Sequence, residues 1–323
     1  MQITFLGTSS GVPTKSRNVS GLALKKQDSK SWTLIDCGEG TQHQLLHTKL
    51  SLKNLKTICI THVHGDHCYG LPGLLATTAM TGRTEPLTII APKGIEEFVT
   101  STFKLTDTHL NYSIEFISVE SLGLYDKDKE FKIEAIELSH RVPSFAYSFT
   151  EQSRSRRLDI DKLQKLGIER GPLWGQLQSG QSITLDNGQE IQAADCYLPL
   201  EKARKIIIGG DNDTPDLLAQ AAKEADLLVH ESTYTSAVSE KVGPGPQHSC
   251  AKRVAQFAEH SRVKNLILTH FSARYQPDSD KTDSIDEVEN EAKQYFKGNL
   301  WLANDLDRYH LDKNRLVTKQ INE

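Results

Sequence analysis

The sequence lacks the long hydrophobic runs of membrane proteins and the marks of a targeting segment. No part of its 323 residues approaches the roughly 18 to 20 consecutive apolar residues that a membrane-spanning helix requires. The opening MQITFLGTSS contains no basic region followed by a long apolar core, so we expect no signal peptide. These absences predict a soluble, untargeted protein with no membrane partner.

Cysteine is also scarce, and its spacing excludes two common uses. The five cysteines are scattered and none belongs to a Cys-x-x-Cys pair, which argues against a disulfide framework and against a cysteine zinc site. An odd number of separated thiols is typical of a reducing compartment. We therefore expect a cytoplasmic protein.

Positive charge is not in excess. The chain has 38 Lys and Arg against 42 Asp and Glu, which gives a formal net charge of −4. A protein with this balance has no general basic coat for nucleic acid, although a local basic patch remains possible. Any surface that binds an anion must therefore be found locally, and we expect no DNA partner.

What the sequence does contain is an alternation of short apolar runs and helical patterns, which is typical of a layered α/β fold. The strands and helices are assigned from the periodicity of the apolar residues and from the turn residues between the apolar runs. It predicts strands near 2–7, 21–26, 31–36, 56–60, 87–92, 114–119, 131–139, 205–210, 226–231 and 265–270, and helices near 40–46, 71–80, 95–104, 215–225 and 248–260.

Residues 150–195 interrupt this alternation. They hold few long apolar runs, many charges and the glycine-rich stretch GPLWGQLQSG, so we interpret them as an insertion that projects from the core. A charge run is most often a solvated face, but on a projection a basic cluster favours phosphate binding. The basic residues of the cluster are Arg154, Arg156, Arg157, Lys162 and Lys165.

The stretch ITHVHGDHCYG follows an apolar run and holds His62, His64, Asp66 and His67. Neutral imidazole and carboxylate are ligands that zinc prefers. Four ligands so close in sequence can hardly converge on one tetrahedral ion and still leave a catalytic position open. The spacing therefore indicates two adjacent metal ions.

The remaining ligands are expected at other strand ends. His140 ends the run AIELSH, Asp211 follows IIIGG, and His270 ends LILTH. A single histidine or aspartate at such a place would more often be a strand or turn cap. Its repetition at three strand ends, in company with H-x-H-x-D-H, predicts a dinuclear site.

The pattern H-x-H-x-D-H, followed by a lone histidine, a lone aspartate and a final histidine, resembles the metallo-β-lactamase superfamily. Within it, the chain closely resembles the ribonuclease Z family of tRNA 3′-processing endonucleases over nearly its whole length. LIDCGEGTQHQLL matches one block of that family. The opening FLGTSSGVPTKSRN matches the family's P-x-K-x-R-N loop, with Pro13, Lys15, Arg17 and Asn18.

Three shorter motifs strengthen the resemblance. HEST at 230–233 resembles the family's HEAT motif, HSC at 248–250 resembles its HST motif, and GPLWGQLQSG resembles the tip of its tRNA-gripping arm. The chain departs from the family pattern at Ser232, at Cys250 and in GGDNDTP, where the family usually has G-D-T. These changes affect the surroundings of the ligands and leave the ligands themselves intact.

The resemblance implies a four-layer αβ/βα sandwich. It also implies a single catalytic domain over 1–323, with an inserted flexible arm at 152–192. It also implies two zinc ions per subunit. In the family pattern, one zinc is held by three histidines, the other by an aspartate and two histidines, and one aspartate bridges both. The corresponding residues are His62, His64 and His140 for the first, Asp66, His67 and His270 for the second, and Asp211 for the bridge.

Two such ions, roughly 3.5 to 4 Å apart, can share a hydroxide that attacks a phosphodiester. Asp66 can accept a hydrogen bond from that hydroxide, which makes it the candidate general base. His248 is the candidate proton donor to the leaving oxygen, with Glu231 holding its ring. The alternative for His248 is a helix cap or a surface residue. His230 also ends a strand but is assigned a structural role, because the ligand set is complete without it.

The resemblance further implies a substrate, precursor tRNA, whose 3′ trailer is removed to leave a tRNA 3′-hydroxyl and a trailer 5′-phosphate. Family members are homodimers in which the arm of one subunit serves the active site of the other. Lys15, Arg17 and Asn18 are expected near the cleavage site. The expected arm contacts to tRNA are Arg154, Arg156, Arg157, Gly171 and Pro172.

Two other functions stay open at this stage. A different hydrolase of the superfamily, acting on a small phosphodiester, a thioester or a lactam, would share every metal ligand but would have no use for a basic arm. A non-catalytic RNA-binding module could keep the fold, but the intact ligand set argues against it.

Overall fold

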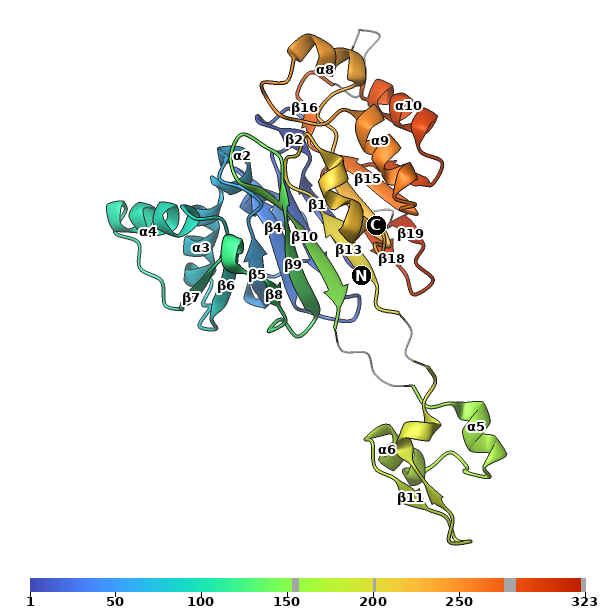
Figure 1. Cartoon of the computed structure of the whole chain (residues 1–323). Helices are drawn as coiled ribbons and strands as arrows, with labels where there is room; N and C mark the ends of the chain where they lie inside the picture. The colour runs from blue at the N-terminus through green and yellow to red at the C-terminus, as the bar shows by residue number, and fades with distance from the viewer. Residues whose placement is uncertain (153–156, 200–201, 276–282, 321–323) are drawn as a thin grey trace. The chain divides into compact units, whose positions relative to one another are not determined.

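A computed structural model describes residues 1–152, 157–199, 202–275 and 283–320 (Figure 1). The chain forms two compact units. The larger comprises Met1–Thr150 and Arg204–Glu323, and the smaller comprises Glu151–Ala203. Among the described residues, no helix is long and apolar enough to cross a membrane.

The first sheet of the larger unit is mixed, with eight strands among the described residues, in the order β19-β18-β1-β3-β4-β5-β6-β7. The run from β4 to β7 is parallel, and β1 and β3 are antiparallel to their neighbours. The strands are β1 (Gln2–Gly7), β3 (Gly21–Lys25), β4 (Trp32–Cys37), β5 (Leu55–Cys59), β6 (Leu87–Ala91), β7 (Ile114–Ser118), β18 (Arg308–Leu311) and β19 (Val317–Gln320).

The second sheet has seven strands within the described ranges, in the order β17-β15-β14-β13-β10-β9-β8. Its neighbours β13, β14, β15 and β17 are parallel, while β10 is antiparallel to β13. The strands are β8 (Leu124–Tyr125), β9 (Phe131–Leu138), β10 (Ser144–Glu151), β13 (Lys205–Ile208), β14 (Leu227–Glu231), β15 (Asn265–Thr269) and β17 (Asn299–Leu302).

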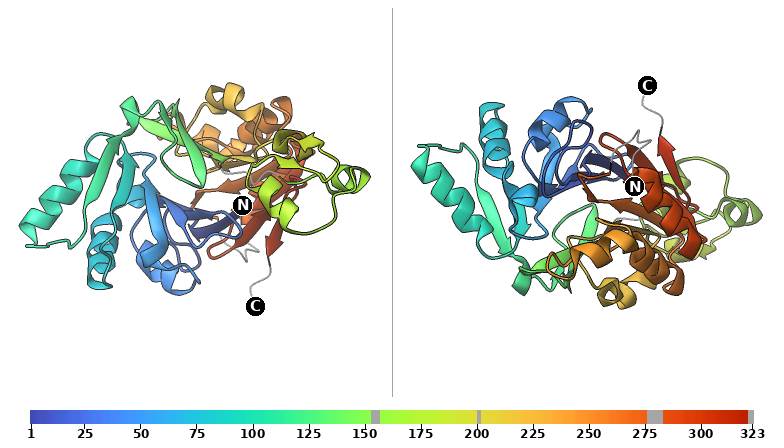
Figure 2. Two further views of the ribbon diagram at one scale, coloured as in Figure 1. Left: turned by 90° about the horizontal axis from the view of Figure 1, so that it is seen from below. Right: turned by 90° about the horizontal axis from the view of Figure 1, so that it is seen from above.

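Three apolar cores fix the layer order of the larger unit. The central core, with Phe5, Tyr147 and Ile206, takes side chains from both sheets. The other two cores lie between each sheet and its helices, and Figure 2 shows these helices on the outer faces of the sheets. The helices are α1 (Thr41–Leu46), α2 (Gly65–Cys68), α3 (Leu71–Met80) and α4 (Ile95–Leu105) on the first sheet, and α7 (Ala219–Ala222), α9 (Ala251–His260) and α10 (Ile285–Tyr295) on the second. The predicted four-layer α/β sandwich is confirmed.

Most predicted elements lie within one or two residues of their predicted bounds, and two predicted helices differ more. The helix predicted at 215–225 is a 3-10 turn, η4 (Pro215–Leu218), followed by the four-residue α7. The helix predicted from 248 begins only at Ala251, so His248 lies in the preceding loop. The His248 side chain therefore projects from a loop and not from the surface of helix α9.

The smaller unit has a core of its own. The side chains of Leu163, Leu177, Ile183 and Cys196 are buried against one another, so this segment is a folded unit rather than an extended loop. Its elements are α5 (Ile160–Lys165), α6 (Pro172–Gln178), β11 (Ile183–Thr184) and β12 (Glu190–Ile191). The Asp159 side chain caps α5 by accepting a hydrogen bond from the Lys162 amide at 3.0 Å.

Candidate metal centre

The carboxyl ends of the parallel strands deliver polar side chains to one edge of the larger unit. His62 follows β5, Asp211 follows β13, and His270 follows β15. Because neighbouring parallel strands end at the same sheet edge, residues far apart in sequence meet there. The structure brings all the predicted ligands together, in the groups His62, His64, His140 and Asp211, and Asp66, His67 and His270.

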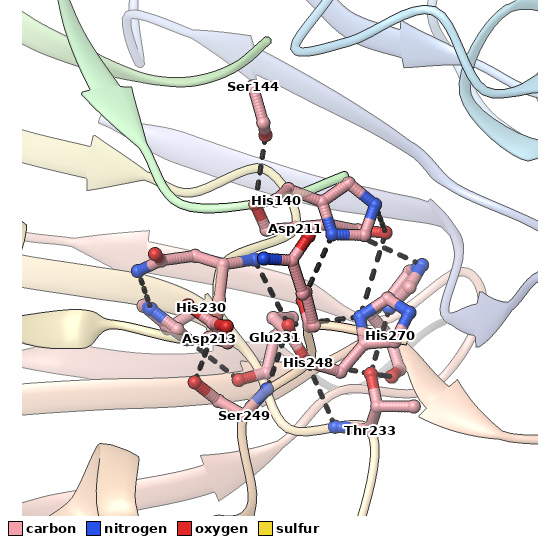
Figure 3. Close-up of polar contacts among 12 residues, drawn as sticks. His140, Ser144, Asp211, Asp213, His230, Glu231, Thr233, His248, Ser249 and His270 are labelled. Carbon is pink, nitrogen blue, oxygen red and sulfur yellow. Dashed lines mark hydrogen bonds and ion pairs between the residues drawn. The ribbon is translucent and has the colours of Figure 1, made fainter. Parts of the chain in front are cut away.

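Asp211 lies close to members of both groups, and Figure 3 shows it with His140 of the first group and His270 of the second. Its Oδ2 atom lies 3.5 Å from Nε2 of His62 and 3.7 Å from Nε2 of His140. Its Oδ1 atom lies 3.5 Å from Nε2 of His67 and 3.3 Å from Nε2 of His270. Each oxygen therefore faces one set of ligands, which is the geometry that a bridging carboxylate needs.

These separations fit ligands that share an ion. Two atoms bound to one zinc at about 2.0 to 2.1 Å in a tetrahedral arrangement lie roughly 3.3 Å apart. Within the second group, Nε2 of His67 lies 3.3 Å from Nε2 of His270, and Oδ2 of Asp66 lies 3.5 and 3.4 Å from the same two atoms. Nε2 of His62 is buried without a hydrogen-bond partner, as a nitrogen reserved for a metal would be.

In three of these histidines, the Nδ1 atom forms a hydrogen bond with another part of the protein. Nδ1 of His67 lies 2.7 Å from Oδ2 of Asp36, and Nδ1 of His140 lies 2.9 Å from the Gln247 carbonyl oxygen. Nδ1 of His270 lies 3.1 Å from the Thr233 hydroxyl. A donor role for these Nδ1 atoms leaves Nε2 with a lone pair directed at the centre, as in most histidine metal sites.

Burial and charge at the centre match the needs of cations. Burial lowers the pKa of His62, His64 and His140, so these imidazoles stay neutral and able to ligate. At His67, burial opposes protonation, but the carboxylates of Asp211, Asp36 and Asp66 outweigh it and raise the pKa well above its usual range. These buried carboxylates concentrate negative charge at the centre, and bound metal ions would neutralise it.

Asp66 is ionised despite its burial. Burial favours its neutral form, but the neighbouring imidazoles of His67 and His270 hold the pKa of its carboxyl well below the usual range. Its Oδ2 atom also accepts a hydrogen bond of 2.8 Å from the backbone amide of Gly11. The loop after β1 therefore helps to orient this carboxylate.

His248 lies beside the two groups. Its Nδ1 atom lies 3.1 Å from Oε1 of Glu231 and 3.7 Å from Oδ2 of Asp211. Burial opposes its protonation, but the Glu231 carboxylate outweighs this effect and raises the pKa of His248 to about 9. The imidazolium form is the one that can donate a proton.

Glu231 is fixed by its hydrogen bonds. It accepts from the backbone amides of Asn212, Thr233 and Ser249, each at 3.1 Å, and from the Thr233 hydroxyl at 2.6 Å. Burial raises the pKa of its carboxyl, but His248 and further imidazoles outweigh that and hold it well below the usual range. A carboxylate held in this way can set the orientation of the His248 ring.

Sequence reasoning missed two residues of this site. Asp36 holds His67 and also accepts from Thr61, at 2.7 Å from its amide and 2.9 Å from its hydroxyl. Asn212 donates from its side chain to Nε2 of His230 at 3.1 Å. The one available signal for Asp36 was its place at the end of the strand in LIDCGEG.

His230 itself is fully buried and belongs to neither ligand group. Its Nδ1 atom lies 2.7 Å from the carbonyl oxygen of Glu231, and its Nε2 atom pairs with Asn212. Both ring nitrogens are thus engaged with the protein, in agreement with a structural role.

The residues predicted to contact substrate have different surroundings. Lys15 is exposed, but Arg17 is buried, and its guanidinium donates to the Thr8 hydroxyl and the Ala303 carbonyl, each at 2.7 Å, and to the Asn304 side chain at 2.9 Å. The backbone amide of Asn18 donates to Asp305 at 2.6 Å. Of these three residues, Lys15 is exposed, Asn18 is half-buried and Arg17 is buried.

In the smaller unit, Arg157 is exposed, and Gly171 and Pro172 form the start of α6. Arg154 and Arg156 lie outside the described residues.

Comparison with known proteins identifies the family. A family model described as "Anti-Pycsar protein Apyc1" matches residues 1–150. A Ribonuclease Z of Marinobacter nauticus is 49% identical over 313 residues, which cover 97% of this chain and 97% of that protein. The solved structure of human tRNase Z, short form, matches with a TM-score of 0.65 and 28% identity, over 97% of this chain and 100% of that one.

The fold extends to more distant proteins. The metallo-beta-lactamase fold protein YhfI from Bacillus subtilis matches with a TM-score of 0.64 and 16% identity, over 99% of this chain and 99% of that one. This likeness concerns the fold alone, whereas the bacterial relatives match in sequence along almost the entire chain. The chain therefore belongs to the ribonuclease Z family, hydrolytic nucleases of the metallo-β-lactamase type.

Proposed function

We propose that this chain is a zinc-dependent endoribonuclease that removes the 3′ trailer from precursor tRNA. The products are a tRNA with a 3′-hydroxyl and a trailer with a 5′-phosphate. The observation that carries the proposal is the placement of Asp211, whose two carboxylate oxygens face separate ligand groups directly beside His248. The family relationship, which includes a human tRNase Z, supports the choice of substrate.

Three histidines, His62, His64 and His140, would hold one zinc ion, and Asp211 would bridge it to the second. The second would be held by Asp66, His67 and His270. When bound, two such ions activate water near neutral pH and neutralise charge on a phosphodiester. The separations of 3.3 to 3.7 Å between Asp211 and the histidine nitrogens support this division.

Asp66 is proposed as the general base. Its ionised carboxylate lies at the second ligand group, and the Gly11 amide holds its Oδ2 atom at 2.8 Å. In that position it accepts a hydrogen bond from the attacking oxygen and orients that oxygen toward phosphorus.

His248 is proposed as the general acid. When the phosphorus–O3′ bond breaks, the leaving ribose oxygen needs a proton, and the protonated His248 supplies it. Glu231 orients the ring and stabilises its charged form at a distance of 3.1 Å. Proton transfer by a positioned side chain of this kind contributes about 100- to 10,000-fold to a rate.

Recognition of the tRNA body is assigned to the smaller unit. Arg157, with Arg154 and Arg156, supplies positive charge for phosphates, and Gly171 and Pro172 begin α6 within the arm-like motif. Lys15 is proposed to contact the nucleotides at the cleavage site, with Arg17 and Asn18 in the same loop. We further propose a homodimer in which each smaller unit serves the partner's site, and a cytoplasmic location, which suits the five unpaired buried cysteines.

The test compares four substrates, precursor tRNA, a small phosphodiester, a thioester and a lactam, with and without chelator. Trailer-bearing precursor tRNA should be cleaved once, with the expected end groups, and activity should return on addition of zinc to the chelated protein. A small chromogenic phosphodiester should be hydrolysed less efficiently. Cleavage of the small phosphodiester, a thioester or a lactam without cleavage of precursor tRNA would instead identify a different hydrolase of the superfamily. RNA binding without any hydrolysis would identify a binding module.

A further inference from the structure

An aromatic ring and a guanidinium lie next to the proposed general acid. The ring centroid of Tyr234 is 6.2 Å from that of His248, with an interplanar angle of 77°. Cζ of Arg274 lies 5.7 Å from the Tyr234 ring centroid. Neither residue belongs to the ligand groups, and neither has a part in the chemistry proposed above. His248, Tyr234 and Arg274 form a continuous row of a proton donor, an aromatic ring and a cation.

The backbone holds this row in place. The amide of Thr235 donates to the hydroxyl of Tyr275 at 2.8 Å, and Tyr275 is almost fully buried. Tyr234 and Arg274 each immediately precede one of these two residues, so the Thr235–Tyr275 contact keeps their segments side by side. On the other side, the Ala251 amide donates to the Tyr234 carbonyl at 2.9 Å, next to the loop of His248.

Their side chains remain accessible. Arg274 is exposed and Tyr234 is half-buried. A fixed aromatic ring offers a stacking surface to any nucleobase at little entropic cost, and a guanidinium pairs well with phosphate. This combination is common where proteins bind single-stranded RNA, whose unstacked bases are free to stack on side chains.

The chemistry of the cleavage decides which nucleotide lies there. The oxygen that leaves is the O3′ of the nucleotide on the 5′ side of the scissile phosphate. If His248 protonates that oxygen, the ribose of this nucleotide lies against His248, and its base is the next group along the row. In this placement the base can stack on Tyr234, and the nucleotide's own 5′ phosphate can reach Arg274.

From this arrangement we propose that Tyr234 and Arg274 form the binding subsite for the last nucleotide retained on the tRNA. Tyr234 stacks on its base and Arg274 pairs with its 5′ phosphate. The proposal rests on the endoribonuclease function described above. It makes these two residues determinants of the cleavage position, because they fix the nucleotide whose O3′ is released.

The experiment measures kcat/KM for Tyr234→Ala and Tyr234→Phe on two precursor tRNAs, one of them abasic at the nucleotide just 5′ of the cleavage position. Stacking of one base on an aromatic side chain corresponds to about 5- to 150-fold. Tyr234→Ala should lose that factor on the intact precursor, and Tyr234→Phe should retain most of the activity. On the abasic precursor, wild type and Tyr234→Ala should be equal, since no base remains to stack.

Arg274→Gln should weaken binding of both precursors and reduce the slope of log K against log salt by about one. The matched control is the pair of Lys252 and Tyr295, in which the Lys252 Nζ lies 5.3 Å from the ring centroid. Tyr295→Ala should show no dependence on the abasic substitution. Zinc content should be unchanged in all variants, and Tyr295→Ala should hydrolyse the small phosphodiester as the wild type does.

An equal loss for Tyr234→Ala on intact and abasic precursors would overturn the proposal and assign Tyr234 to the support of His248. A matching loss on the small phosphodiester would lead to the same conclusion. If the wild type cleaves no precursor tRNA at all, the proposed function fails and this subsite fails with it. Cleavage by wild type with an unchanged Tyr234→Ala rejects the subsite alone.

Discussion

Nδ1 of His248 lies 3.1 Å from Oε1 of Glu231, and that carboxylate is itself held by the backbone amides of the two loops around it. The pair is built like a general acid with its orienting group. Because the carboxylate stabilises the imidazolium, His248 keeps its proton to a higher pH than a free histidine does. The contact makes separate predictions for the two residues.

His248→Ala should slow precursor cleavage by about 100- to 10,000-fold, because the leaving oxygen loses its proton donor. Zinc content should not change. A substrate with an activated leaving group needs little protonation, so its hydrolysis should fall far less. Single-turnover rates on both substrates, together with metal analysis, provide the check. Equal losses on the two substrates would assign His248 to positioning or metal support.

Glu231→Gln should move the alkaline limb of the pH–rate profile toward lower pH. The amide can still accept hydrogen bonds, but it removes the negative charge that raises the pKa of His248. A raised folded-state pKa keeps the acid form at neutral pH, and that form is lost as pH rises through the pKa. The measurement is kcat against pH for wild type and variant. An unshifted limb in a folded, zinc-loaded variant would show that another group carries the titration.

Asp211→Ala should reduce bound zinc and abolish most activity, because each of its oxygens faces a different ligand group. Asp213→Asn is the matched control, since its Oδ1 atom accepts from the Thr214 hydroxyl at 2.7 Å and the residue belongs to none of the ligand groups. Zinc per chain, determined after dialysis against a weak chelator, decides the matter. Retention of two zinc ions with near-normal cleavage would refute the bridging role.

Arg17→Met should destabilise the protein by on the order of 3 kcal/mol, because two buried acceptors and one part-buried acceptor lose a charged donor. Lys15→Ala should leave the free energy of unfolding unchanged and act on precursor tRNA, through a higher KM or a shifted cleavage position. Urea unfolding and product mapping separate the two effects. A stable Arg17→Met protein with a defect in cleavage position only would restore Arg17 as a substrate contact.

The same contrast shows what a sequence can and cannot reveal. The convergence of the proposed metal ligands could be predicted because His62, Asp211 and His270 follow apolar strands, and strand ends converge at one edge of a sheet. The burial of Arg17 was not, since it depends on the ring of Phe271, 4.9 Å from its Cζ, and on acceptors near residue 303. The local sequence around a charged loop residue does not indicate whether segments distant in the chain will bury it.

Asp36 illustrates a limit set by topology. Its contact with Thr61 arises because β4 and β5 pair in parallel, with Ile35 opposite Cys59, so that the two strand ends adjoin. Nothing in the local sequence specifies that pairing. Helix α10 was not predicted, for another reason. Its fully buried residues are Val288 and Ala292, and two apolar positions are too few to give a clear helical periodicity.

The last prediction separates RNA recognition from chemistry by removing the smaller unit, Glu151–Ala203. Thr150 and Lys205 are direct partners in the antiparallel pair of β10 and β13, so the chain ends left by the deletion lie on adjacent strands. An Asn-Gly linker that joins Thr150 directly to Lys205, with Arg204 also removed, can therefore close a two-residue hairpin loop. Every proposed zinc ligand lies outside the deleted segment, so zinc content and hydrolysis of the small phosphodiester should persist.

Precursor tRNA should then bind more weakly, and its binding should depend less on salt. Removing lysine and arginine contacts to phosphates removes the counterion release that makes log K fall with log salt. Replacing Arg154, Arg156 and Arg157 by alanine in the intact chain should reproduce part of the change, without the loss of a folded unit. Binding is measured between 50 and about 200 mM salt, the range over which such contacts have their largest effect. If the shortened protein is folded and zinc-loaded yet binds with unchanged affinity and salt slope, the smaller unit is not the tRNA-binding element. Recognition would then have to come from the loop of Lys15 and from the Tyr234 subsite.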